Sequence, residues 1–123
     1  MPSAKYDFKN TAIKRNACEQ GADFNFVFTW KDQSNIAINL SGYSARMQVR
    51  LTPQSASPVL DLLSGSAITL GGAAGTISIS ISNSQTSGLS PGEFYYDLVL
   101  TSGTGVKTRL VEGVFEVTAS VTR

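Results

Sequence analysis

Hydrophobic and polar residues alternate at every second position along most of the chain. The clearest run is residues 24–30, in which Phe24, Phe26, Phe28 and Trp30 are separated by single residues. Successive side chains of a β-strand point to opposite faces, whereas residues two apart do not share a helix face. The run therefore predicts a strand with one aromatic face, and that face is expected in the core.

Other alternating runs predict the remaining strands. They cover residues 36–40, 43–51, 59–63, 67–70, 76–81, 93–101, 106–110 and 115–121. The glycine-rich segment 71–75 predicts a hairpin turn, and Glu112-Gly113 predicts a β-bulge. Residues 83–89 are the one helix candidate, a single turn that Pro91 ends.

Short strands with turn signals between them, and no helix-length segment, predict an all-β sandwich or small barrel. The predicted domain covers residues 21–123. Residues 1–20 form a separate N-terminal segment, in which Tyr6 and Phe8 hint at a strand. This segment is either an arm that reaches a neighbouring subunit or a loose tail or edge strand.

Composition narrows the classes of function. The chain has 123 residues, which fits one domain, and charged residues make up 15%. A net charge of +1 argues against nucleic-acid binding, which needs a basic surplus. No apolar run approaches the length of a membrane span, and residues 1–6 lack the apolar segment of a secretory signal. We therefore expect no membrane or nucleic-acid partner and synthesis in the cytoplasm.

The residue composition gives little support for a catalytic function. The chain has no histidine and one cysteine, Cys18, so histidine-based catalytic triads, a zinc site and an intrachain disulfide are all disfavoured. Cys18 is expected to be an ordinary small residue rather than a reactive thiol. No loop has the spacing of a calcium-binding EF-hand. The sequence predicts no enzyme, no cofactor and no metal.

Carboxylates are the remaining route to catalysis. Asp97 and Glu112 fall on adjacent predicted strands, as the two acids of a glycoside hydrolase would. Cationic side chains share the outward face of that sheet, namely Arg46, Arg50, Lys107 and Arg109. Cross-strand ion pairs are therefore the simpler interpretation of Asp97 and Glu112.

One strand carries large aromatic residues on both faces. If Phe94 and Tyr96 fill the core, Tyr95 and Val99 lie outside. A strand that is hydrophobic on both faces is usually covered on both, and in a short chain another subunit can supply the cover. Tyr95 is therefore the predicted protein contact.

A carbohydrate platform is the alternative use of exposed aromatic residues. Tyr43, Tyr95 and Trp30 could stack against sugar rings. The alternation places Trp30 in line with the aromatic core strand, which favours a core position for it. A glycan-binding module for host attachment therefore stays an alternative of another class.

The order of short motifs along residues 20–123 is similar to that of a known group of proteins. The motifs are Trp30 with Asp32, Leu40-Ser41-Gly42-Tyr43, Arg46-Met47-Gln48-Val49-Arg50, Ile77-Ser78-Ile79, residues 82–89, Pro91-Gly92-Glu93-Phe94-Tyr95-Tyr96-Asp97-Leu98, and finally Gly105, Arg109-Leu110, Gly113 and Val121-Thr122-Arg123. Together they resemble a group of short virion proteins of tailed bacteriophages. The first twenty residues depart from the group's pattern, because Gly21-Ala22-Asp23-Phe24 stands where a Gly-x-Thr-Phe-like start is usual.

The resemblance implies an immunoglobulin-like antiparallel β-sandwich of about eight strands in a structural protein of a phage particle. It implies a role in joining tail, neck or fibre proteins, with capsid decoration as the alternative. The implied partners are other virion proteins, in several symmetry-related copies, and the implied location is the virion. It brings no catalytic residues.

Overall fold

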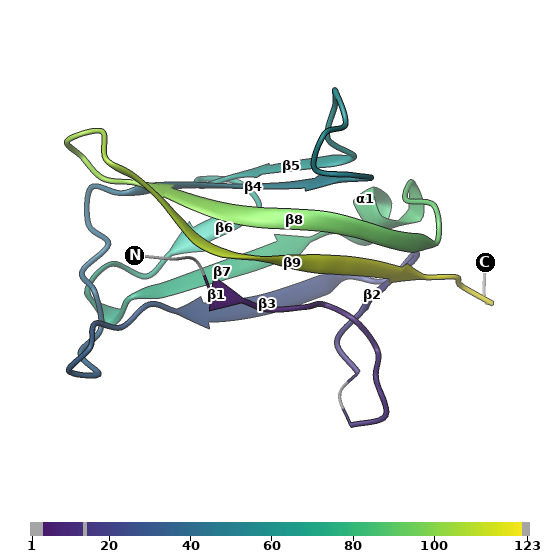
Figure 1. Ribbon diagram of the computed structural model, residues 1–123, viewed down its shortest axis with the longest axis horizontal. Helices are drawn as coiled ribbons and strands as arrows, with labels where there is room; N and C mark the ends of the chain where they lie inside the picture. Colours follow the sequence, from purple (N-terminus) through teal and green to yellow (C-terminus); the bar gives the residue numbers. More distant parts are fainter. Residues whose placement is uncertain (1–3, 14, 122–123) are drawn as a thin grey trace.

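The chain folds into two β-sheets packed face to face (Figure 1). The computed structural model describes residues 4–13 and 15–121. The strands are β1 (Ala4–Lys5), β2 (Cys18–Glu19), β3 (Phe24–Thr29), β4 (Ser44–Arg50), β5 (Leu60–Leu63), β6 (Ile68–Leu70), β7 (Thr76–Ile81), β8 (Gly92–Thr101) and β9 (Lys107–Thr118). The predicted all-β sandwich is confirmed.

The larger sheet has six strands in the order β1-β9-β8-β4-β5, with β2 also paired to β9. Neighbours pair antiparallel, except that β1 and β2 run parallel to β9 along the same edge. The smaller sheet has the order β3-β7-β6 and is antiparallel. The chain therefore crosses between the layers several times.

The core between the sheets consists of the inward-facing side chains that the alternation predicts. On β4, Ala45, Met47 and Val49 are buried, and their outward neighbours are exposed or half-buried. Phe24 on β3 is buried, and Phe26 packs against the same cluster. Burial of about twenty hydrophobic side chains is the main source of stability in a chain that lacks a disulfide.

The N-terminal segment was predicted as a unit separate from the domain, residues 1–20. Its described residues instead pack into the core. The Tyr6 amide donates to the Glu112 carbonyl (3.0 Å), and the Phe8 amide donates to the Val114 carbonyl (2.8 Å). The Phe8 side chain is fully buried. Residues 4–8 and β2 thus form an edge of the larger sheet.

The turns follow their sequence signals closely. The predicted hairpin at residues 71–75 joins β6 to β7, and it contains a 3₁₀ turn, Gly72–Ala74. The predicted helical turn is α1 (Asn83–Ser87), which Ser82 caps through its side chain. Ser82 and Gln85 form a capping box, which satisfies backbone amides at the start of the helix.

Two predicted features are wrong. Residues 36–40 do not form a strand, because their amides bond to two different segments: Ile38 donates to Trp30 (2.9 Å) and Leu40 to Gly72 (2.9 Å). The β-bulge of β9 lies at Leu110 rather than at residues 112–113, since Leu98 pairs with Val111 and the next residue pairs with Arg109. Alternation alone does not reveal which neighbour a segment pairs with.

Candidate docking surface around Tyr95

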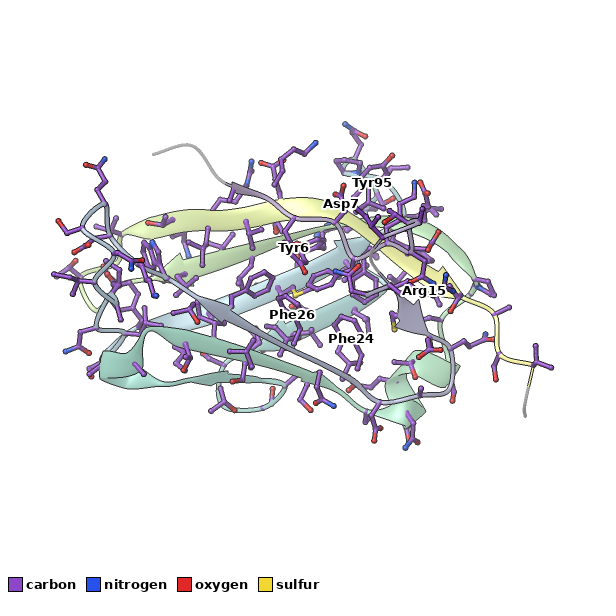
Figure 2. The ribbon with its side chains drawn as sticks, turned by 90° about the horizontal axis from the view of Figure 1, so that it is seen from below. Tyr6, Asp7, Arg15, Phe24, Phe26 and Tyr95 are labelled. Atoms are coloured by element: carbon purple, nitrogen blue, oxygen red, sulfur yellow. The ribbon has the colours of Figure 1, made fainter. Side chains whose placement is uncertain are left out.

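Tyr95 lies on the outer face of the larger sheet, on β8, which runs between β4 and β9. Its cross-strand neighbours are Arg50 on β4 and Val114 on β9. The side chain is 43% exposed, whereas Phe94 and Tyr96 on either side are buried. Figure 2 shows Tyr95 on the outside of the molecule, away from Phe24, which points between the sheets. The predicted division of this strand into two hydrophobic faces is confirmed.

A shallow hollow with a volume of about 290 Å³ lies beside the Tyr95 ring. Lys5, Tyr96 and Gly113 line part of it, and we call the other lining residues the Tyr95 surface: Gln48, Arg50, Pro53, Tyr95, Asp97, Arg109, Glu112 and Val114. The register explains how these residues meet, because Gln48 pairs with Asp97 and Asp97 pairs with Glu112. Three strands therefore contribute polar side chains around one exposed aromatic ring.

The carboxylates of this surface share one cation. The Arg109 guanidinium lies 3.4 Å from an Asp97 oxygen and 3.5 Å from a Glu112 oxygen. The predicted cross-strand ion pair is confirmed for Asp97, whereas the Glu112 pair lies within β9, because Arg109 and Glu112 belong to the same strand.

Arg46 and Asp61 form a second cross-strand ion pair on the same face. Two hydrogen bonds join them, at 2.8 Å from Arg46 Nε and 2.6 Å from Arg46 Nη2. These hydrogen bonds lower the pKa of Asp61 below its ordinary value. The pair is largely exposed, so its contribution to folding is small.

Arg50 is held beside Tyr95 by neutral partners. Its guanidinium donates to the Ser55 carbonyl (2.7 Å) and to Gln48 Oε1 (2.9 Å). An ordered arginine next to an exposed tyrosine combines two residue types that are enriched in protein interfaces. Sequence reasoning found Tyr95 but not its pairing with Arg50, although both residues were correctly placed on outward faces.

The three aromatic residues proposed as a sugar platform do not come together. Trp30 contacts Tyr43 edge to face, with ring centroids 6.0 Å apart, and both pack against the core. Tyr43 precedes the end of the β4-β8 ladder at Ser44, whereas Tyr95 pairs with Arg50 at the other end. At about 3.3 Å per residue, the ladder separates Tyr43 from Tyr95 by roughly 20 Å.

Cys18 is fully buried in the core. Burial raises the pKa of its thiol to about 11. Because the thiolate is the reactive form, the folded protein holds Cys18 in an unreactive state, as a small core residue would be. Over residues 4–13 and 15–121, no cluster of three metal-ligating side chains occurs and no helix is long and apolar enough to cross a membrane.

Comparison with protein-family models gave no match, and comparison with curated proteins gave none either.

Proposed function

We propose that this protein is a non-enzymatic structural component of a bacteriophage particle, which joins tail, neck or fibre proteins through the outer surfaces of its sandwich. Two kinds of evidence support the proposal. The motif order resembles short virion proteins, and the fold presents an aromatic contact on a rigid sheet. Neighbouring virion proteins are the proposed partners.

The observation that carries the docking role is the exposure of Tyr95 beside Arg50. Tyr95 stays 43% exposed on a paired strand, while its neighbour Tyr96 fills the core at this place. Tyrosine buries a large area with little loss of conformational freedom, so it is an efficient contact residue. A partner that covers the Tyr95 surface would also bury the half-exposed Val114.

The test is protein mass spectrometry of phage particles purified by density gradient from a culture whose phage encodes this chain. We expect its peptides in the particle fraction, at a copy number comparable with other tail or neck proteins. Their absence from purified particles, while the protein is present in the lysate, would contradict the proposal. Immunogold labelling over the head surface would favour capsid decoration instead.

The docking surface is tested by Tyr95→Ala in the same phage. We expect the variant to fold, because the side chain lies outside the core, and to be depleted from particles at least about tenfold. Val106→Ala is the matched control, since Val106 is 62% exposed and lies in the β8-β9 hairpin, outside the Tyr95 surface. Equal incorporation of both variants would remove Tyr95 from the contact.

One specific observation favours a second candidate, binding of a host glycan. The Tyr95 ring stands beside Gln48 and Asp97, which are the kinds of polar groups that hydrogen-bond sugar hydroxyls. The isolated protein would then bind defined oligosaccharides on an array, and Tyr95→Ala would abolish the signal. Incorporation of that variant into particles would stay normal, which separates this candidate from the docking role.

A further inference from the structure

The outer edge of β3 is unpaired. The Trp30 amide donates to the Gly75 carbonyl across the β3-β7 ladder (2.8 Å). Bonded residues alternate along an antiparallel pair, so Phe28, Phe26 and Phe24 also bond toward β7. The amides and carbonyls of residues 25, 27 and 29 therefore point away from β7. No further backbone bond reaches them from the part of the chain that the structure describes.

This edge lacks the features that protect edge strands from pairing. Charged residues, proline, bulges and short length are the usual protection. β5 has four residues with Asp61 among them, β6 has three, and β1 and β2 have two each. β3 has six residues, and none of them is charged or proline. Among the described edges, β3 is thus the one suited to accept another strand.

We propose that β3 pairs antiparallel with β3 of a second copy of this chain, about a two-fold axis at Val27. The pairing joins the two small sheets into one continuous sheet across the dimer. In this register Val27 lies opposite Val27 of the second copy, and Asn25 lies opposite Thr29. Each strand offers three outward amides and three outward carbonyls, which gives about six hydrogen bonds between the copies.

The charges at the ends of β3 select this register. Asp23 precedes the strand and Lys31 follows it, and both side chains are exposed. An axis at Val27 brings Asp23 of each copy opposite Lys31 of the other, so that two ion pairs close the ends of the ladder. If the axis were moved by one residue along β3, Asp23 and Lys31 would no longer lie opposite each other. The edge is therefore complementary to itself, as a two-fold interface requires.

The exposure of the side chains on β3 is consistent with a second copy of the chain at this edge. Val27 is 55% exposed, and in the pairing it meets the same apolar side chain at the axis. Phe26 and Phe28 face the core but are half-buried, because they stand at the open side of the sandwich. The outer faces of β3, β6 and β7 carry hydroxyl, amide and small apolar groups and no charge. Two copies can therefore approach without electrostatic repulsion.

This inference rests on the proposed structural role and deepens it, because it names a second copy as one of the partners. It uses a different surface from Tyr95, on the opposite layer of the sandwich. A dimer formed through β3 leaves both Tyr95 surfaces free. Each dimer would then present two equivalent docking surfaces to other virion proteins.

The experiment is light scattering on the purified full chain, from micromolar to millimolar concentration, with circular dichroism to confirm folding. We expect the wild type to dimerise. Val27→Lys places two ammonium groups together at the axis and should weaken the dimer at least about tenfold. Lys31→Asp should also weaken it, because the introduced carboxylate of each copy then faces Asp23 of the other. The double variant Asp23→Lys/Lys31→Asp should restore dimerisation.

Val106→Lys and Lys107→Asp are the controls, since they make similar changes of charge far from β3 in the larger sheet and its hairpin. Both should leave the dimer unchanged. A wild-type monomer at millimolar concentration would overturn the β3 pairing, as would a dimer that Val27→Lys does not weaken. Neither result affects the proposed function, which is decided by the presence of the chain in purified particles.

Discussion

Gly113 of β9 faces the backbone carbonyl of Tyr6 so closely that a methyl group at position 113 would overlap the carbonyl group. The Tyr96 hydroxyl donates to this same carbonyl oxygen (2.5 Å). Glycine within a strand commonly marks a place where another backbone comes close. Gly113 is thus the residue that lets the N-terminal segment lie against the larger sheet.

Gly113→Ala should therefore lower the free energy of unfolding by about 1–3 kcal/mol, the usual cost of overpacking. Urea unfolding followed by circular dichroism measures it. Gly103→Ala is the matched control, because its new methyl group would meet only the Gly42 carbonyl oxygen, at an ordinary 3.5 Å. We expect that control to change stability by less than about 1 kcal/mol. Similar losses in both variants would contradict the close approach at Gly113.

Phe8→Ala should cost about 3–5 kcal/mol of unfolding free energy, as truncation of a buried phenylalanine does. The Phe8 ring lies 5.0–5.9 Å, between centroids, from six other aromatic rings of both sheets. Ile13→Ala, at a side chain that is 96% exposed, should change stability by less than about 0.5 kcal/mol. If residues 4–8 were a detachable arm, Phe8→Ala would instead have the same urea midpoint of unfolding as the wild type.

The Cys18 thiol should react with Ellman's reagent far more slowly in the folded protein than in urea. Its pKa of about 11 reduces the thiolate fraction at pH 8 by on the order of 100-fold relative to an exposed thiol. Burial of the side chain slows the reaction further. Absorbance of the released thiolate measures both rates, and equal rates would show that Cys18 is accessible.

The Arg46–Asp61 pair should give a small dependence of stability on pH. The pKa of Asp61 is lowered by hydrogen bonds from Arg46, so the folded state favours the charged carboxylate. This contribution is fully present above the unfolded-state pKa near 3.8 and is lost as the pH falls through the lower folded value. The difference in urea midpoint between wild type and Asp61→Asn should shrink below that pH. A difference that grows on acidification would contradict the assignment.

Local patterns predicted most of the elements because local chemistry decides them. The alternation along residues 24–30 placed Phe24 in the core, and the segment before Pro91 was correctly expected to form the single helical turn. The same reasoning predicted a strand at residues 36–40 that does not form, because an extended segment with alternating side chains does not always pair with one continuous strand. The outward position of Tyr95 was predicted from its strand alone, because Phe94 and Tyr96 on either side fill the core.

The sequence by itself determined that the chain is all-β, which side of each long strand faces inward, and that no histidine is present for catalysis. Tertiary structure decided what depends on register and strand order. It paired Tyr95 with Arg50, gave Asp97 and Glu112 a shared Arg109, packed Phe8 into the core and left β3 open at one edge. The physical reason is that side-chain alternation is a property of one strand, whereas neighbours across strands are fixed by packing of the whole chain.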